Sequence, residues 1–245
     1  MANNTITFVA ERFPSGGPPP RPTAISLPRS PHALIIGPTG SGKSVASMLL
    51  TAKISFHVKD SKVWILDYKG DDSFSFLRGV PGARYFQYMD CLSGLREYFS
   101  MFQERLSGNP NRAFRLLWCD EWQSLILNLP KKEAEEAKSM LSTVLTMGRS
   151  MGCQVLTSTQ QASASLFAQG SGTREQYSII LALGNIGRES ASMLGLERET
   201  MLPCTTIGSG HLLLNSAEQK PVQVPLIGPR GMARMKEDIL RAVTR

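Results

Sequence analysis

The sequence has few cysteines and no long apolar run, and both absences narrow the class of protein. The four cysteines, Cys91, Cys119, Cys153 and Cys204, lie far apart and lack the paired spacing of zinc sites and redox pairs. No apolar stretch approaches the roughly 18 to 20 residues that span a bilayer. Residues 1–13 lack a basic region followed by an apolar core. These features predict a reduced, cytoplasmic protein whose membrane association would come through a partner.

Histidine clusters and internal repeats are also absent from the sequence. His32, His57 and His211 show no metal-ligand spacing, so we interpret them as structural residues. Apolar residues make up 42% of the chain and charged residues 19%, a balance that excludes wholesale disorder. At 245 residues the chain is long enough for one α/β domain with a full core.

The charge balance is basic. The 27 Lys and Arg residues against 20 Asp and Glu residues give a net charge of +7. This excess favours an acidic partner such as nucleic acid or an anionic membrane surface. Charge alone is a weak indicator, because many basic proteins bind no nucleic acid.

Strand and helix patterns alternate along most of the chain. Short apolar runs rich in β-branched residues predict strands at 33–36, 63–67, 116–120, 154–159, 178–183 and 211–215. Apolar residues at helical spacing predict helices over 45–52, 92–106 and 131–148. This order predicts an α/β fold with a mainly parallel sheet flanked by helices on both faces.

The two ends of the chain differ from this alternating region. Residues 1–23 are predicted to form a short strand and then, over 14–22, a stiff Pro/Gly-rich linker or surface arm. Residues 24–228 form the predicted core. Residues 229–245 form an amphipathic basic helix, which we expect to pack on its own domain, on a neighbouring subunit or along DNA.

A glycine-rich phosphate loop follows the first strand of the core. Residues 37–44, GPTGSGKS, match the pattern GxxxxGK[ST] between a predicted strand and a predicted helix. Backbone N–H groups of such a loop surround the β-phosphate, Lys43 contacts the β- and γ-phosphates, and the Ser44 hydroxyl binds Mg²⁺. The residues predicted to bind ATP are Pro38, Thr39, Gly40, Ser41, Gly42, Lys43, Ser44 and Val45.

A second predicted strand ends in two carboxylates. Residues 116–121, LLWCDE, would carry Asp120 to the Mg²⁺ ion and Glu121 to the water that attacks the γ-phosphate. Alone, such a strand end is more often an exposed turn. Downstream of a phosphate loop, the catalytic interpretation is favoured.

Two further strand ends carry polar residues. Asp67 and Lys69 follow residues 63–66 and would lie either near the ligand crevice or in a solvated turn. Gln160 follows the strand 154–159, and its neutral amide would contact the γ-phosphate or the attacking water. Either feature alone is a weak indicator, but both fit a nucleotide site.

The ordered set of motifs resembles the ATPase core of the FtsK/HerA superfamily. SLPRSPHALIIGPTGSGKSV, ILDYKGDD, CDEW and GRSMGCQVLTSTQ resemble successive blocks of that core, followed by IGRESASMLG and IGSGHLLLN. The resemblance runs from about residue 26 to residue 226. It implies a RecA-like sheet and an ATP-driven motor, usually a hexameric ring that pulls double-stranded DNA through its pore.

In such rings an arginine of the neighbouring subunit completes the nucleotide site in trans. The resemblance makes Arg149 the first candidate for this role, with Arg188 and Arg174 as alternatives. Arg149 could equally be a surface residue that caps the preceding helix. Candidate DNA-contacting loops are Lys131 with Lys132 and the segment 168–176, or these are simply a helix start and a surface loop.

The chain departs from the family pattern in two respects. Gln161 and Ala162 stand where Arg-Pro often follows the Thr-Gln pair. The membrane segments, extra motor subdomain and DNA-reading domain of chromosome-segregating members are not in this sequence, which suggests a stripped-down motor from a mobile element or virus. We therefore hypothesise a DNA translocase of the transfer or packaging type. The alternatives are an ATPase for protein or pilus secretion, with a protein partner at a membrane or capsid portal, and a monomeric switch.

Overall fold

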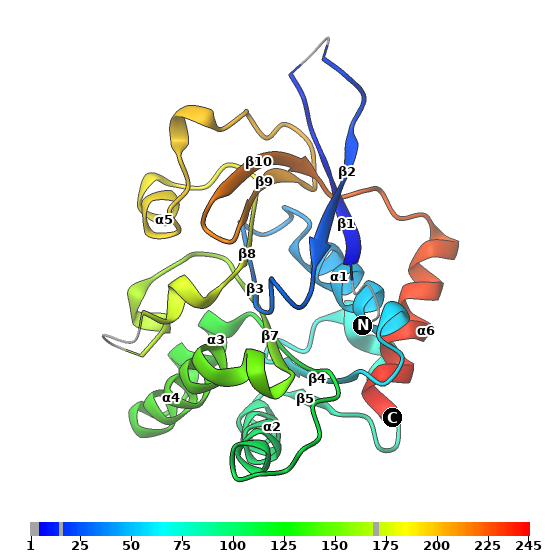
Figure 1. Cartoon of the computed structure of the whole chain (residues 1–245), viewed down its shortest axis with the longest axis vertical. Helices are drawn as coiled ribbons and strands as arrows, with labels where there is room; N and C mark the ends of the chain where they lie inside the picture. Colours follow the sequence, from blue (N-terminus) through cyan, green and yellow to red (C-terminus); the bar gives the residue numbers. More distant parts are fainter. Residues whose placement is uncertain (1–4, 15–16, 169–171) are drawn as a thin grey trace.

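The computed structural model describes residues 5–14, 17–168 and 172–245, and a single sheet runs through the described part (Figure 1). Its parallel strands are β3 (Ala33–Ile36), β4 (Lys62–Asp67), β5 (Tyr85–Gln87), β6 (Arg115–Asp120), β7 (Cys153–Thr159) and β8 (Ile179–Leu183). Its antiparallel strands are β1 (Thr5–Glu11), β2 (Arg21–Ser26), β9 (Ser209–Leu214) and β10 (Glu218–Gln223). The strand order is β2-β1-β10-β9-β8-β3-β7-β6-β4-β5.

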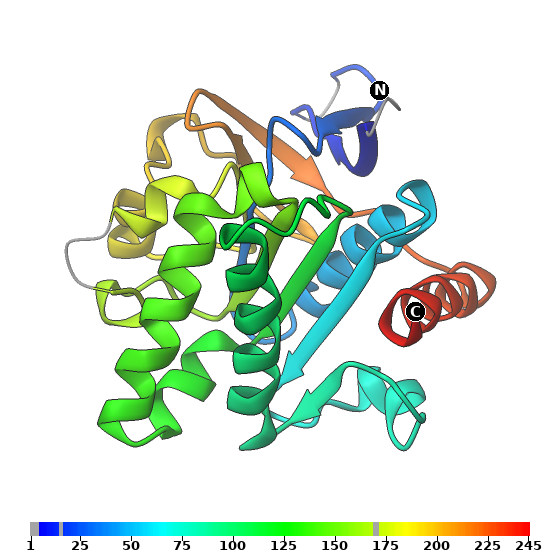
Figure 2. The same ribbon diagram turned by 60° about the horizontal axis from the view of Figure 1, so that its bottom comes forward.

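The helices lie on both faces of this sheet. The α-helices are α1 (Lys43–His57), α2 (Asp90–Leu106), α3 (Trp122–Asn128), α4 (Lys131–Met147), α5 (Arg188–Met193) and α6 (Pro229–Thr244). The 3₁₀ helices are η1 (Asp72–Leu77), η2 (Gly148–Met151), η3 (Ala164–Leu166), η4 (Thr173–Gln176) and η5 (Arg198–Thr200). One apolar core lies beneath α1 and α6 and the other beneath α2, α3 and α4, on the opposite face (Figure 2). The predicted α/β class with a mainly parallel sheet is confirmed.

The central strands are apolar on both faces because helices cover both. Every residue of β3, β6, β7 and β8 is buried. β3 lies between β7 and β8, with Ile36 opposite Thr159 and Ala182. The carboxyl ends of β3, β7 and β6 therefore meet at one edge of the sheet, where a ligand crevice forms in parallel α/β folds.

The N-terminal segment differs from its prediction. We expected residues 14–22 to form a linker or arm, but β2 begins at Arg21 and includes Pro22. Proline is tolerated here because β2 is an edge strand, where an N–H group without a ladder partner can face solvent. β1 and β2 extend the same sheet as the core, and the proposed domain limits at residues 23 and 228 stay predictions.

The C-terminal helix α6 packs against its own domain. Met235, Ile239 and Val243 are buried against α1 and β4. On the partly exposed side, the Arg234 guanidinium lies over the ring of Phe56 at 5.1 Å from the ring centroid. Of the three placements predicted for this helix, packing on its own domain is the one observed. Among the described residues, no helix is long and apolar enough to cross a bilayer.

Candidate nucleotide-binding site

The phosphate loop, residues 37–42, connects the buried strand β3 to the N-terminus of α1. Gly42 precedes the helix with a φ of 97°, a left-handed conformation that a side chain would strain. No side chain caps this helix end, and its first turn holds no acidic residue. The first N–H groups of α1 are therefore free to bind an anion, with the positive end of the helix dipole behind them.

The atoms around the loop fit a triphosphate with its magnesium ion. The Ser41 hydroxyl is buried and has no hydrogen-bond partner among the described residues. Lys43 is buried, and its Nζ donates to the Pro38 carbonyl oxygen at 3.2 Å, so it turns back over the loop. Burial lowers the pKa of Lys43, and the carboxylates of Glu121 and Asp120 partly offset that effect. The Ser41 hydroxyl, the Lys43 ammonium group and the uncapped N–H groups of α1 thus lie together around the loop.

The two acids at the end of β6 have different surroundings. Asp120 is buried and accepts a hydrogen bond from the Ser158 hydroxyl at 2.5 Å. Glu121 has a φ of 51°, a left-handed conformation that turns the chain from β6 into α3. Its carboxylate lies 3.8 Å from Lys43 Nζ and 3.3 Å from Lys69 Nζ. The turn thus places Glu121 between two lysines beside the phosphate loop, whereas Asp120 stays in the sheet.

The structure separates the two polar residues at the end of β4. Lys69 reaches the site through its ion pair with Glu121. Asp67 is buried and accepts hydrogen bonds from the Gly70 N–H at 2.9 Å and the Tyr85 hydroxyl at 2.7 Å. Burial raises the pKa of Asp67, and these donors partly oppose the rise. Asp67 therefore stabilises the turn, and only Lys69 contacts a predicted catalytic group.

Gln160 lies at the carboxyl end of β7, between the phosphate loop and the acids. The neighbouring Thr159 carbonyl oxygen accepts a hydrogen bond from the Gly37 N–H at 3.3 Å, which connects β7 directly to the loop. Gln160 is partly exposed. Its backbone position is suited to sensing a γ-phosphate, and that role stays a prediction.

The candidate arginines occupy different edges of the sheet. Arg149 is exposed in η2, which precedes the amino end of β7, so it lies at the edge opposite its own phosphate loop. Arg188 is exposed at the start of α5, after the carboxyl end of β8, on the same edge as the loop. Arg174 belongs to η4, and its side chain lies outside the described part of the chain. Of the candidate DNA loops, Lys131 and Lys132 are exposed, whereas residues 169–171 of segment 168–176 lie outside the described residues.

Two contacts at the site were missed at the level of sequence. Ser158 accepts a hydrogen bond from the Glu121 N–H at 3.2 Å and donates to Asp120, so one hydroxyl positions both acids. The segment before β9 also lies against the loop, because the Gly208 N–H donates to the Ser41 carbonyl oxygen at 3.0 Å. A Cβ placed on Gly42 would lie 3.4 Å from Cγ2 of Ile207. The only signals in the sequence were the Thr-Ser-Thr-Gln run and the Gly-Ser-Gly turn.

We expect the stability of the metal-free protein to depend on pH through Asp120. Burial raises the pKa of Asp120 from 3.8 to about 7, with Asp67 and Glu121 adding to the rise. Between these pH values the unfolded chain has lost the proton that the folded protein keeps. The free energy of unfolding should therefore fall as pH rises from about 4 to about 7, by about 3 kcal/mol from this residue. Above about pH 8 this residue no longer contributes to the pH dependence.

Urea unfolding in EDTA at several pH values measures this effect. The Asp120→Asn variant should be less dependent on pH than the wild type, and relatively more stable at pH 8 than at pH 4. Equal pH dependence in the two proteins would contradict the assignment.

Among the described residues, no group of three or more His, Cys, Asp or Glu side chains forms a ready metal site. Mg²⁺ would accordingly be held by Ser44 and Asp120 together with phosphate oxygens.

Comparison with known proteins was made at the level of sequence and of structure. No protein-family profile matches the chain. The chain is 28% identical over 168 residues to the FtsK domain-containing protein YdcQ of Bacillus subtilis, a match that covers 63% of this chain and 34% of YdcQ. It is 25% identical over 162 residues to the type VII secretion system protein EssC of Staphylococcus aureus, covering 54% of this chain and 10% of EssC. The chain thus spans a small part of these relatives.

The fold also matches a solved structure of the same type. ATPases 2 and 3 of EssC from Geobacillus thermodenitrificans superpose with a TM-score of 0.70 at 15% identity, covering 97% of this chain and 50% of that one. The sheet order, the phosphate loop and the acids at the end of β6 define a RecA-like P-loop nucleotide-binding domain. Within that class, the chain is similar to FtsK-type ATPases, in agreement with the resemblance to the FtsK/HerA superfamily.

Proposed function

We propose that the protein is an ATP-hydrolysing motor. The position of Glu121 carries this proposal: its carboxylate lies between Lys43 and Lys69, beside the phosphate loop. A carboxylate at this point can accept a proton from the water that attacks the γ-phosphate. Lys43 would hold the β- and γ-phosphates, and Gln160 would contact the γ-phosphate or the water. Bound Mg²⁺, near Ser44 and Asp120, would neutralise charge on the phosphate oxygens.

We further propose that the motor works as a ring, in which each nucleotide site includes an arginine of the next subunit. Arg149 supports this arrangement because it is exposed and lies at the sheet edge opposite its own loop. It cannot reach its own nucleotide across the length of β7. If the neighbouring subunit packs the sheet edge that carries its phosphate loop against this edge, Arg149 would lie beside the γ-phosphate of the neighbour's nucleotide. The resemblance to FtsK/HerA motors favours six subunits.

Double-stranded DNA is the proposed substrate of movement. The net charge of +7 and the similarity to an FtsK domain-containing protein support it. The test compares ATP hydrolysis with and without duplex DNA at low salt. We expect stimulation that decreases as salt rises, because phosphate contacts release counterions. Active protein with no stimulation by duplex DNA would contradict this part of the proposal.

A protein substrate is the second candidate, and the similarity to EssC favours it. In this case the partner would be a protein at a membrane or capsid portal. A retention assay in the presence of ATP separates the two candidates. ATP-dependent retention on a candidate partner protein, without retention on duplex DNA, would support secretion. Retention on duplex DNA alone would support translocation.

We expect Ile207 to contact the base or ribose of the bound nucleotide. Its side chain is 70% exposed, and it is held against Gly42 by the hydrogen bond from the Gly208 N–H to the Ser41 carbonyl oxygen. Replacing Ile207 with Ser removes apolar contact area without adding charge. The Kd for ATP should rise about fivefold to tenfold, since burying part of such a side chain contributes about 1 kcal/mol.

Inorganic tripolyphosphate provides the control ligand, because it has no base. Its Kd should be the same for the wild type and Ile207→Ser, measured by calorimetry. Leu226→Ser is the matched control variant, since Leu226 is 94% exposed and apolar. Equal losses for ATP and tripolyphosphate would instead indicate a damaged phosphate loop.

A further inference from the structure

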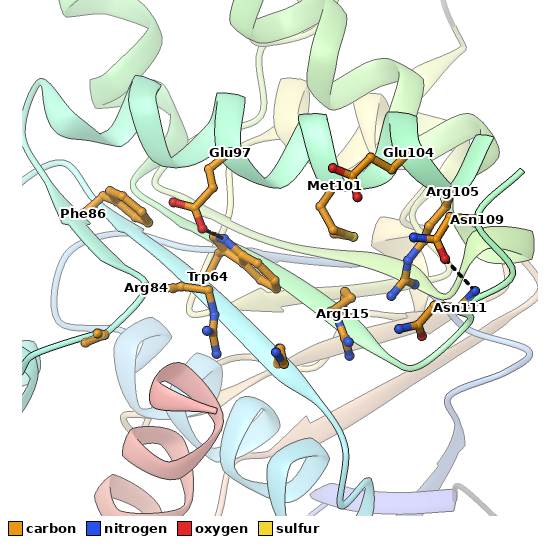
Figure 3. A pocket seen from close by; sticks show the side chains of 13 residues that line it. Trp64, Arg84, Phe86, Glu97, Met101, Glu104, Arg105, Asn109, Asn111 and Arg115 are labelled. Carbon is orange, nitrogen blue, oxygen red and sulfur yellow. Dashed lines mark hydrogen bonds between the residues drawn. The ribbon is translucent and has the colours of Figure 1, made fainter. Parts of the chain in front are cut away.

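A second hollow lies far from the phosphate loop. It has a volume of about 580 Å³ and opens between α2 and the amino ends of β4 and β6 (Figure 3). The parallel strands place these ends at the sheet edge opposite the loop. This volume is within the range of about 300 to 1,000 Å³ that is usual for small-molecule sites.

Four cationic side chains line the hollow: Lys62, Arg84, Arg105 and Arg115. Arg105 is 2% exposed and Arg115 is 8% exposed, so two full charges lie at the floor. In the described part of the chain, none of the four lies within 4.0 Å of a side-chain carboxylate oxygen. Arg84 donates to the main-chain oxygens of Ala242 at 2.9 Å and Arg245 at 3.5 Å. Buried charges are normally paired, because their desolvation is costly. Against these four cations the lining holds two carboxylates, Glu97 and Glu104, so the described side chains balance the positive charge only in part.

The carboxylates of the hollow are at its rim. Glu97 and Glu104 both project from α2 and are exposed (Figure 3). Glu97 accepts a hydrogen bond from the Trp64 indole N–H at 2.8 Å. The Arg84 guanidinium lies over the same indole, 4.8 Å from the ring centroid, and its Nε has no hydrogen-bond partner among the described residues. One donor of the cluster thus remains unused.

Backbone carbonyl groups hold the floor arginines in place. Arg105 Nη1 donates to the carbonyl oxygens of Ala113 at 2.9 Å and Met151 at 2.6 Å. Arg115 Nη1 donates to the carbonyl oxygen of Asp60 at 3.1 Å. These bonds orient the guanidinium groups but supply no negative charge. The site is therefore preorganised and positive.

The cations also repel one another. Burial lowers the pKa of Lys62, and the charges of Arg84 and Arg115 lower it further. An anion within the cluster would relieve this repulsion and use the free donors of the guanidinium groups, which match phosphate geometry.

We propose that this hollow binds a small phosphate-bearing molecule at a second site, separate from the phosphate loop. Deep burial of Arg105 and Arg115 favours a small molecule over a DNA backbone, because a duplex cannot enter a concave site to reach its floor. Arg105 also bonds the carbonyl of Met151 in η2, the segment that carries Arg149. A ligand bound in the hollow would therefore affect η2 and Arg149, at the edge that is proposed to face the neighbouring subunit.

Calorimetric titration with sodium pyrophosphate tests this proposal. The protein carries Lys43→Ala, so that binding at the phosphate loop is weakened. In this background Lys62→Met should raise the Kd for pyrophosphate about tenfold, the equivalent of one charged contact. Glu104→Gln should lower the Kd about twofold to threefold, because it removes a carboxylate from the rim. Among the described residues Lys62 makes no side-chain hydrogen bond, so the fold should survive its replacement, which a thermal melt checks.

Lys132→Met is the control, because Lys132 is exposed on α4, outside the hollow. An equal rise in Kd for this variant, or an unchanged Kd for Lys62→Met, would overturn the proposal. Absence of pyrophosphate binding would overturn it too. If duplex DNA competed with pyrophosphate and Lys62→Met removed this competition, the ligand of the hollow would be nucleic acid and not a small molecule. None of these results depends on ATP hydrolysis, so the proposed motor function is tested separately.

Discussion

Replacing Glu121 with Gln should lower the rate of ATP hydrolysis by about 10²-fold to 10⁴-fold, the usual contribution of a general base. Glutamine keeps the size of the side chain but cannot accept a proton from water. ATP should remain bound, since the phosphate loop and Lys43 are unchanged. Phosphate release measures the rate, and calorimetry measures the Kd for ATP.

The change also removes the ion pairs of Glu121 with Lys43 and Lys69. Loss of these pairs leaves both lysines free to bind phosphate, so the affinity for ATP should rise or stay unchanged. Glu199→Gln is the matched control, because Glu199 is exposed in η5 and should leave the rate unaltered. Turnover that survives Glu121→Gln would show that another group accepts the proton.

Replacing Arg149 with Ala should reduce hydrolysis by about 10³-fold or more, the range known for arginine fingers. Arg149 lies at the edge opposite its own loop, so the lost charge would belong to the site of the neighbouring subunit. Binding of ATP by a single subunit should be unchanged. Steady-state hydrolysis at a protein concentration that supports the ring measures the loss.

A mixing experiment tests whether Arg149 acts in trans. Subunits with Arg149→Ala keep an intact loop, and subunits with Lys43→Ala keep an intact Arg149. Each variant alone should be inactive, whereas their mixture should regain part of the activity at mixed interfaces. If the mixture recovers no activity, Arg149 does not act in trans. If Arg188→Ala recovers activity when mixed with Lys43→Ala and Arg149→Ala does not, the role belongs to Arg188. Arg198→Ala, exposed in η5, is the neutral control.

The strands that the sequence predicted well are those with a physical reason to be apolar. β3, β6 and β8 are covered on both faces, so each contains a continuous apolar run. β7, CQVLTST, is equally buried but has only a short apolar centre between polar residues. β10, with the sequence EQKPVQ, has no such run because most of its residues are only partly buried. Its pairing with β1 and β9 depends on hydrogen bonds between backbone groups, which do not depend on the type of side chain. Even Pro221, which has no N–H group, accepts a hydrogen bond from the Arg12 N–H at 2.8 Å.

The same distinction applies to the site. A phosphate loop is formed by neighbouring residues, so the sequence GPTGSGKS is enough to predict it. It provides the glycines for the turn, the lysine and the start of the following helix. The positions of Lys69 and Ser158 around Glu121 are not local, since Lys69 follows β4, Glu121 follows β6 and Ser158 lies in β7. Only the parallel register of the sheet brings these three strand ends together.

By itself, the sequence determined that the chain is an α/β protein with a phosphate loop, and it indicated the FtsK/HerA superfamily. These properties depend on contiguous residues, whose spacing decides turn, helix and strand. The tertiary structure alone decided which polar strand ends share a site, that Asp67 stabilises a turn, and that Arg149 lies at the sheet edge opposite its own loop. It also gathered Lys62, Arg84, Arg105 and Arg115, which come from separate elements, into one hollow. Such groupings arise from packing and register, which no local pattern encodes.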